Sequence, residues 1–378
     1  MKINKTKIKL TLIMSVIMSS IFFMTSCSNK IGPSGSPTAA IEQKTASEIQ
    51  TIKDEGLTVS EVGVGKYPTV PFEERQVGIA YTTWHQQATW DATKMWSMPQ
   101  LGSYKSNNRE VIKKHGEWLS DAGVDFIFVD WSNDIDYEPL VTKNRADFKM
   151  IEDSTKVIFE EYSKMEKSPK ISIFLGCPGQ QGAVTDGRLT RKANQIYDWF
   201  CANPTYRALM QEYLGKPLLV VYANTPTHWP SGTPEWNDDR FTVRWMTGFV
   251  TEQTNLQGPD LLSKYGYWSW EERGAQTYTI FDNKPESMTV VAGWRPQGEP
   301  GDKDYIAPGE RNNGKTFKEQ WARARLIGPK FVLIPTWNEW TKGEQPSIEV
   351  SKDIEPSEAF GTFYLDLMKQ EIAKFKGK

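Results

Sequence analysis

The 378-residue chain is poor in the side chains that most often hold metal ions or form cross-links. It has three histidines, and none of them shows the His-x-x-x-His spacing that favours a zinc site. Beyond the N-terminal segment only Cys177 and Cys201 remain, which is too few for a disulfide framework. The two could pair in an oxidising compartment, but we expect two buried free thiols. We therefore expect no metal and no cofactor. Calcium binding by surface aspartates such as Asp302 and Asp304 is the alternative.

Charge and the lack of familiar motifs exclude further classes of protein. Acidic and basic side chains nearly balance, with a formal net charge of −2, so nothing indicates a nucleic-acid partner or an anionic membrane surface. No Gly-rich phosphate loop follows any predicted strand, and neither a serine elbow nor a Cys–His arrangement is visible. The sequence therefore does not indicate nucleotide binding or catalysis by a serine or cysteine nucleophile.

The N-terminal segment predicts export and lipid attachment. It begins with a cluster of lysines, and the apolar run Leu10 to Met24 that follows is too short to span a bilayer comfortably. The run ends in Met24-Thr25-Ser26-Cys27, which resembles a bacterial lipobox and implies cleavage before Cys27 and acylation of its thiol. A plain signal peptide with an incidental cysteine is the alternative.

The chain then divides into three parts. Residues 1–26 form the signal peptide, residues 27–70 a polar tether with a short helix from Ala46 to Lys53, and residues 71–378 the folded domain. We expect a monomer that is anchored through Cys27 to the bacterial cell envelope, on its periplasmic face or at the cell surface.

Apolar runs alternate with amphipathic stretches along the folded domain. The predicted strands are Val77–Thr83, Phe126–Trp131, Ile171–Gly176, Leu218–Tyr222, Phe241–Met246, Tyr265–Trp270, Met288–Gly293 and Phe331–Trp337. The predicted helices are Asn108–Ala122, Asp147–Lys167, Thr190–Cys201, Thr316–Leu326 and Ser357–Phe375. Nearly continuous apolar strands suit a parallel sheet covered on both faces. This rhythm predicts an α/β fold, a (β/α)8 TIM barrel in one domain, with a doubly wound open sheet as the alternative.

Polar and aromatic side chains gather where these strands end. In a (β/α)8 barrel the carboxyl ends of the strands carry the site, so these side chains should converge on one rim. Fifteen tryptophans in an exported chain favour contact with carbohydrate, because indole rings stack on the C–H face of a sugar. The expected substrate-binding residues are Trp84, His85, Trp131, Asn133, Tyr222, Arg244, Trp270, Trp294, Arg295, Asn338 and Trp340.

Carboxylates at the same rim supply candidate catalytic groups. Glu339 lies between Asn338 and Trp340 just after the last strand, and we expect it to be the essential one. Asp130 ends an apolar strand, although it could instead cap a turn or pair with an arginine. Glu271 and Glu272 should point in opposite directions, so at most one of them enters the site, and we select Glu272.

Two stretches resemble one enzyme family. The first is Pro99-Gln100-Leu101-Gly102-Ser103-Tyr104, followed by Ala122-Gly123-Val124-Asp125; the second is Trp337-Asn338-Glu339-Trp340, followed by Ile354-Glu355-Pro356 and Tyr364-Leu365. Both are similar to segments of glycoside hydrolase family 99 and its relatives, family 71 and the WbsX-like proteins of polysaccharide loci. The resemblance implies a (β/α)8 retaining hydrolase that acts inside α-mannans and related glycans without a metal.

The resemblance also implies two glutamates in the last-strand motif. The first, which assists attack by the sugar's own 2-hydroxyl, falls on Glu339, whereas the second, which protonates the leaving oxygen, falls on Lys342. An unshifted lysine has too high a pKa for that task. The acid could instead be Glu344, which follows the flexible Gly343, or a carboxyl group of another strand, Asp130 or Glu272.

We therefore expect a glycoside hydrolase that acts on a polysaccharide or complex glycan, with Glu339 as its essential carboxylate. The alternative is a lipoprotein that binds glycan on a degenerate hydrolase barrel without cutting it, which the lysine at position 342 motivates. A role in polysaccharide assembly is less favoured, because an exported protein meets no nucleotide sugar.

Overall fold

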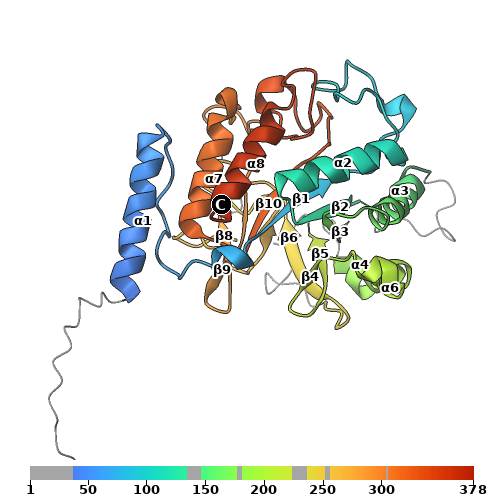
Figure 1. Cartoon of the computed structure of the whole chain (residues 1–378), viewed down its shortest axis with the longest axis horizontal. Coiled ribbons are helices and arrows are strands. Elements are labelled where there is room, and N and C mark those ends of the chain that lie inside the picture. The colour runs from blue at the N-terminus through green and yellow to red at the C-terminus, as the bar shows by residue number, and fades with distance from the viewer. Residues whose placement is uncertain (1–36, 134–145, 177–180, 224–235, 252–255, 304) are drawn as a thin grey trace, which may run out of the picture.

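The structure is a computed structural model that describes residues 37–133, 146–176, 181–223, 236–251, 256–303 and 305–378 (Figure 1). The predicted lipidation site Cys27 lies outside these residues, as do Cys177 and Asp304. Cys201 is buried with a free thiol, as expected. Among the helices of the described residues, none combines the length and apolar character that crossing a membrane requires.

Within the described residues, eight parallel strands form the body of the protein, and their number and order agree with the sequence prediction. The seventh lies four residues earlier than the predicted Met288–Gly293. The eight strands are β1 (Gln76–Tyr81), β2 (Phe126–Trp131), β3 (Lys170–Gly176), β5 (Lys216–Tyr222), β6 (Thr242–Thr247), β7 (Trp268–Ser269), β9 (Lys284–Thr289) and β10 (Phe331–Ile334). Their order in the sheet is β7-β6-β5-β3-β2-β1-β10-β9, so each strand lies beside its neighbour in the chain and β10 returns to β1. The predicted (β/α)8 barrel is confirmed, and the open doubly wound sheet is not found.

The barrel is nearly closed between β7 and β9. There, side chains link the two strands: the Thr289 hydroxyl donates to the carbonyl oxygen of Ser269, and the Trp268 indole N–H donates to Glu286 at 2.9 Å. Two short strands lie outside the prediction. β4 (Glu212–Tyr213) forms a hairpin with β5, and β8 (Tyr278–Phe281) runs antiparallel to β9 at the edge of the sheet.

Alternation along the strands separates the two halves of the core. On β2 the rings of Phe126 and Phe128 fill the barrel, whereas Ile127, Val129 and Trp131 face the surrounding helices. Successive side chains of a strand point to opposite faces, so this register directs every second residue at the carboxyl end into the barrel mouth.

Helices cover the barrel where the chain crosses between strands. They are α2 (Arg109–Ala122), α3 (Ala146–Tyr162), α4 (Gln181–Thr185), α5 (Arg188–Ile196), α6 (Pro204–Arg207), α7 (Lys315–Ile327) and α8 (Phe363–Phe375). Asn108 caps α2 by accepting from the N–H groups of Glu110 and Val111, and Gly123 ends it with φ of 85°. In Figure 1, α7, α8 and α2 lie side by side over one flank of the sheet. The predicted last helix begins later than expected, at Phe363.

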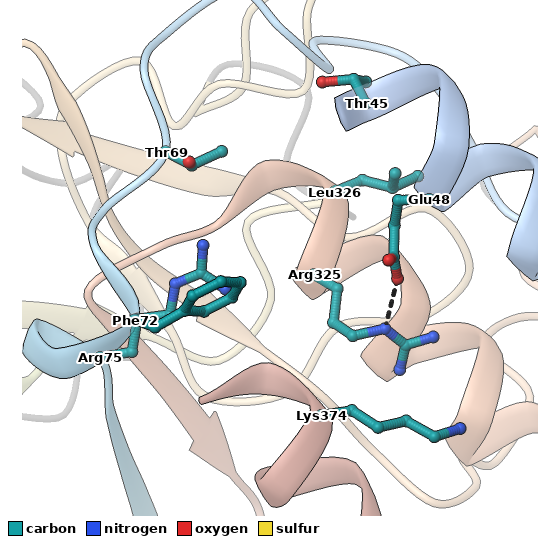
Figure 2. A pocket seen from close by; sticks show the side chains of 8 residues that line it. All are labelled: Thr45, Glu48, Thr69, Phe72, Arg75, Arg325, Leu326 and Lys374. Carbon is teal, nitrogen blue, oxygen red and sulfur yellow. Dashed lines mark hydrogen bonds and ion pairs between the residues drawn. The ribbon is translucent and has the colours of Figure 1, made fainter. Parts of the chain in front are cut away.

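Part of the predicted tether belongs to the folded body. Helix α1 (Pro37–Asp54) is longer than the predicted short helix, and Ile52 and Leu57 are buried against Ala322 and Leu326 of α7. Figure 2 shows the small pocket between these segments, where Glu48 accepts from Arg325 at 2.7 Å. The expectation of a free tether up to residue 70 is therefore wrong from Ile52 onward, because apolar side chains there are buried on the barrel.

Candidate active site

A cavity of about 460 Å³ opens at the carboxyl ends of the strands. All eight parallel strands, or the loops that directly follow them, contribute side chains to its wall. The lining residues are Trp84, Asp130, Ser132, Asn133, Phe174, Tyr222, Phe249, Trp270, Glu271, Arg295, Glu339, Thr341, Glu344 and Lys352. Of the predicted site residues, Trp84, Asp130, Asn133, Tyr222, Trp270, Arg295, Glu339 and Glu344 meet here.

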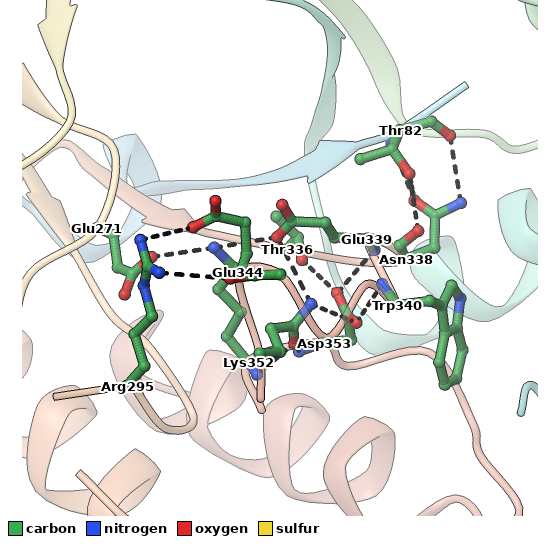
Figure 3. Close-up of polar contacts among 12 residues, drawn as sticks. Thr82, Glu271, Arg295, Thr336, Asn338, Glu339, Trp340, Glu344, Lys352 and Asp353 are labelled. Atoms are coloured by element: carbon green, nitrogen blue, oxygen red, sulfur yellow. Dashed lines mark hydrogen bonds and ion pairs between the residues drawn. The ribbon is translucent and has the colours of Figure 1, made fainter. Parts of the chain in front are cut away.

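A buried lysine joins two glutamates in the wall of the cavity (Figure 3). The Lys352 ammonium lies 3.0 Å from Glu271 Oε2 and 3.0 Å from Glu339 Oε2. Glu339 is only 7% exposed, and Glu271 and Lys352 are each 3% exposed. One cation therefore holds two carboxylates in fixed positions, and low access to water strengthens both attractions.

Burial and this ion pair give the two glutamates different acidities. Burial raises the pKa of Glu339 to about 7, with Asp353 adding to the effect and Lys352 opposing it. Burial also acts to raise the pKa of Glu271, but Lys352 and Arg273 together outweigh it, so that this pKa falls below its usual value. Burial would lower the pKa of Lys352, yet the two carboxylates raise it. Near neutral pH Glu339 can exchange a proton, whereas Glu271 stays ionised.

Asp130 supplies a second carboxyl group with a raised pKa. Its side chain is 5% exposed and accepts a hydrogen bond from the Ser132 backbone N–H at 2.7 Å. Burial raises its pKa, although the bond from Ser132 and the charge of Lys352 act against this. Burial and the charge of Asp130 together raise the pKa of Tyr222, across the cavity, to about 12. Pairs of carboxyl groups with perturbed pKa values in one cavity are typical of sites of acid–base chemistry.

The backbone that carries Glu339 is fixed by Asp353. The Asp353 carboxylate accepts hydrogen bonds from the backbone N–H groups of Glu339 and Trp340, each at 2.7 Å, and from the Gln345 side-chain amide at 2.9 Å. Trp340 has φ of 65°, a left-handed conformation that costs free energy for a tryptophan. The bonds to Asp353 stabilise this turn and so orient the Glu339 side chain toward the cavity.

Three residues expected to bind substrate instead build the support behind Glu339. Asn338 is 1% exposed and bonds the backbone of Thr82, with its Oδ1 accepting from the N–H at 2.9 Å. The Trp340 ring is stacked on Trp96 with centroids 5.0 Å apart. His85 is also buried, and its Nε2 donates to the Asn338 carbonyl oxygen at 2.8 Å. The prediction that Asn338 and Trp340 contact the substrate is therefore wrong. His85 does not line this cavity either, but it lies in the wall of a neighbouring hollow.

Two further tryptophans point away from the cavity. Trp131 faces the helices, where it is fully buried and its indole N–H donates to Thr155 Oγ1 at 2.9 Å. Trp294 packs on Gly309, and its indole N–H donates to the Ala307 carbonyl oxygen at 2.9 Å. Neither lines the cavity, which corrects both predictions.

The predictions for Arg244 and Glu272 are also wrong, because neither side chain lines the cavity. Arg244 pairs with Glu286 at 2.7 Å, near the start of β9, and therefore lies toward the opposite end of the barrel. Glu272 accepts from the Thr251 N–H at 3.2 Å and from the Thr277 hydroxyl, outside the cavity lining. As expected, only one of the two adjacent glutamates enters the site, but it is Glu271.

Aromatic rings form part of the wall. The rings of Trp270 and Phe174 are stacked with centroids 4.9 Å apart and an angle of 6° between their planes. Lys352 lies 5.9 Å from the centroid of Trp270. Trp84 is half-buried on the other side of the mouth, on the loop after β1. Rings held in this way offer apolar faces to a sugar.

The last-strand loop separates Glu344 from Lys342. Glu344 lines the cavity, where its partly exposed carboxylate lies 3.1 Å from Arg295 Nη2. Lys342 instead lines a neighbouring hollow together with Lys94. The position that the family resemblance assigns to the acid is therefore outside the cavity in this chain.

The sequence prediction missed Lys352 and selected Glu272 in place of Glu271. Lys352 directly precedes Asp353 and the quoted Ile354-Glu355-Pro356 segment, but a single lysine there carries no signal without the fold. Asp130 and Trp131 could have been separated by the strand period, since the inward phenylalanines of β2 have the same parity as Asp130. For metal sites, no group of at least three suitably placed His, Cys, Asp or Glu side chains is present within the described ranges.

The fold and this cavity define a (β/α)8 barrel with buried carboxyl groups at the carboxyl ends of its strands. No family model and no curated protein match the sequence. The structure is similar to that of a family 99 endo-α-mannosidase from Bacteroides thetaiotaomicron bound to bis-tris-propane, with a TM-score of 0.53 and 16% identity over 80% of this chain and 98% of that one. A second structure of that kind of enzyme from the same organism gives 0.50 and 15% identity over the same shares. At this identity the likeness shows the fold, and at that level it bears out the resemblance to family 99.

Proposed function

We propose that this protein is a glycoside hydrolase that acts on a polysaccharide or complex glycan. One observation carries the proposal: Glu339 and Asp130, two buried carboxyl groups whose pKa values are both raised, line the same cavity at the carboxyl ends of the strands. Trp84 and Trp270 provide aromatic surfaces beside them. Hydrolysis of a glycosidic bond needs such a pair of carboxyl groups, and sugar rings bind against such surfaces.

Glu339 is proposed as the base. With a pKa of about 7 it is partly ionised at neutral pH, and Lys352 favours the ionised form. The carboxylate takes the proton of the attacking hydroxyl group, which belongs to water or is the sugar's own 2-hydroxyl, while the bond between the sugar and the leaving oxygen breaks. If the 2-hydroxyl attacks, water then opens the three-membered ring at the same carbon, giving a proton to the ionised Asp130 while Glu339 returns its proton to the 2-oxygen. Lys352 and Asp353 hold Glu339 in position throughout.

Asp130 is proposed as the acid that protonates the leaving oxygen. Burial favours its protonated form, which is the form that can donate. Glu344 is less suitable because it is partly exposed and paired with Arg295, and Glu271 because Lys352 and Arg273 lower its pKa. Glu272 does not line the cavity. The pair of Glu339 and Asp130 thus supplies the acid–base function that Lys342 cannot.

The substitution that tests this proposal is Glu339→Gln, which keeps the size of the side chain and removes its charge. We expect release of reducing ends from the true glycan to fall by at least a thousandfold, while affinity for that glycan changes by less than about threefold. The screen starts with α-mannans, the substrate class in the names of the two similar structures. Glu358→Gln, at an exposed position, is the matched control. Turnover of Glu339→Gln close to that of the wild type would contradict the proposal.

A second candidate function is glycan binding without cleavage. The lysine that replaces the expected acid at position 342 favours it. It predicts saturable binding of a glycan in the same cavity with no product from any glycan tested. Product formation by the wild type that Asp130→Asn abolishes would exclude it.

We also propose that the mature protein is a monomer anchored to the cell envelope through lipid on Cys27. The lipobox-like segment before Cys27 supports the lipid anchor. Cys27→Ser should move the protein from the membrane fraction to the soluble fraction and abolish incorporation of a labelled fatty acid. Unchanged membrane association of Cys27→Ser would contradict the lipid anchor.

A further inference from the structure

We infer that the hollow beside the cavity binds an anionic substituent of the glycan, a sulfate ester or a sugar carboxylate. The inference rests on the proposed function, because it names the substrate class of the same site. It begins with the composition of the hollow's lining. Lys94 and Lys342 line this space of about 690 Å³, and no acidic side chain of the described residues does.

The hollow adjoins the catalytic cavity. Trp84 and Thr341 line both spaces, so one glycan chain can extend from one into the other across the Trp84 ring. The basic side of the hollow is built from two segments joined by their backbones. Met95 and Thr341 form an antiparallel bridge, and the Lys342 N–H donates to the Lys94 carbonyl oxygen at 2.8 Å. This pairing holds the two lysines close together.

The positive charges of the hollow are available to a ligand. The Lys342 side chain is exposed and forms no ion pair with any other described residue. Lys94 has one carboxylate near it, Asp91 at 3.7 Å, and the two side chains are 78% and 42% exposed. A pair so open to water is weak. A sulfate or carboxylate held between two ammonium groups gains more, since it meets both charges at once.

The cavity itself is mixed in charge. Asp130, Glu271, Glu339 and Glu344 line it, together with Lys352 and Arg295. With Asp130 protonated, as its proposed role requires, the ionised carboxylates and the two cations nearly balance, and both cations are already paired with these glutamates. An anionic group on the sugar that is cleaved therefore gains no net attraction, whereas the same group on a neighbouring sugar would be attracted to the hollow.

This placement gives the residue at position 342 a role. The family resemblance assigns that position to an acid in the site, but here its side chain lines the adjoining hollow. The exchange from a carboxylate to an ammonium group removes a negative charge and adds a positive one where the substituent would bind. Lys342 and Lys94 thus act as specificity-determining residues.

The experiment compares native acidic glycans with chemically neutralised forms. Substrates are a sulfated glycan before and after desulfation, and a uronate-containing glycan before and after carboxyl reduction, with kcat/KM measured for each. We expect the wild type to prefer an anionic form by about tenfold, and that preference to decline as salt increases. The pair that shows the preference identifies the group as sulfate or carboxylate.

Variants assign the preference to the hollow. The double substitution Lys94→Gln with Lys342→Gln should lower the ratio of anionic to neutral kcat/KM about tenfold, whereas Lys369→Gln on an exposed face of α8 should leave it unchanged. Equal rates on charged and neutral forms, or a double variant that keeps the ratio, would overturn the inference.

A binding measurement separates this inference from the proposed function. The Glu339→Gln protein and its triple variant lacking both lysines are titrated with the same four glycans. Tighter binding of an anionic form, lost in the triple variant, would support the hollow as an anion subsite even if no glycan is cleaved. Equal binding of charged and neutral forms would overturn it even if the protein proves to be a hydrolase.

Discussion

The Lys352 ammonium lies 3.0 Å from Glu339 Oε2, and neither side chain is more than 9% exposed. The same ammonium lies 3.0 Å from Glu271 Oε2, so it is shared between a carboxylate with a raised pKa and one with a lowered pKa. Without this cation, burial would act unopposed on Glu339. Lys352 is therefore a positioning residue that also sets the ionisation of the proposed base.

The first prediction concerns the pH dependence of hydrolysis. Glu339 must be ionised to act as a base, and its pKa is about 7. On an aryl glycoside with an acidic phenol as leaving group, which needs no proton from Asp130, kcat/KM should therefore increase with pH through about pH 7. In Lys352→Met a cation that lowers this pKa is lost, and the rise should move to higher pH. A pH profile of wild type and variant checks this. An unchanged midpoint in the variant would show that Lys352 does not set the pKa of Glu339 and would contradict the prediction.

The same substitution should reduce stability. Removal of one partner leaves Glu271 and Glu339 buried without their shared cation, which costs about 3–5 kcal/mol when a buried ion pair is broken. Urea unfolding at pH 8, where both carboxyl groups of the wild type are largely ionised, measures the loss. Lys369→Gln, at an exposed position on α8, is the control and should change the free energy of unfolding by less than about 0.5 kcal/mol.

The second prediction follows from the raised pKa of Glu339. The unfolded chain loses this proton near pH ~4.3, whereas the folded protein keeps it up to about pH 7. Between these values the folded state binds more protons, so the contribution of Glu339 to stability falls as pH rises. Glu339→Gln lacks this contribution. The Tm of Glu339→Gln relative to wild type should therefore increase across this window, and a constant difference would contradict the raised pKa.

The third prediction tests the role of Asp130 as the acid. Asp130→Asn should lower kcat/KM on a natural glycan by at least a hundredfold, because the leaving sugar hydroxyl needs a proton. On an aryl glycoside with an acidic phenol as leaving group the loss should be less than about tenfold. Glu339→Gln should be impaired on both substrates. Asp121→Asn, an exposed residue near the end of α2, serves as control. Equal losses of Asp130→Asn on both substrates would argue against the assignment.

The fourth prediction concerns Trp270 and Trp131, which both lie at strand ends in the sequence but differ in role: one should affect glycan binding and the other stability. Trp270→Ala removes a ring from the cavity wall and should weaken glycan binding by about 1–2 kcal/mol, or roughly tenfold in affinity. Trp131→Ala removes a fully buried ring between barrel and helices and should cost about 3–5 kcal/mol of stability. Titration with glycan and urea unfolding measure the two effects. A selective loss of glycan affinity in Trp131→Ala would contradict its placement.

Much of the fold could be predicted because it depends on local patterns. Apolar runs at regular intervals located seven of the eight parallel strands closely and the seventh in order, β9, four residues late, and Asn108 and Gly123 marked the ends of α2. The hairpin strand β4 and the edge strand β8 were missed because each is short and depends on a partner strand and not on its own composition.

The site was predicted in part for a related reason. Strand ends located Asp130, Trp270 and Glu339, since the barrel brings carboxyl ends together wherever they lie in the chain. The direction in which each side chain points was harder to predict from the sequence. Asn338 and Trp340 flank Glu339 in the sequence, yet both point into the support behind it because Asp353 and Thr82 hold the turn.

By itself, the amino-acid sequence determined the barrel and the rim where the chemistry lies, because strand periodicity and the order of elements are encoded locally. Only the tertiary structure decided which carboxyl groups share a cavity and what their pKa values are. Burial and the charge of Lys352 set those values, and Lys352 reaches Glu271 from a segment 81 positions away in the sequence. Such long-range electrostatics depend on the packed protein as a whole and have no counterpart in a local pattern of residues.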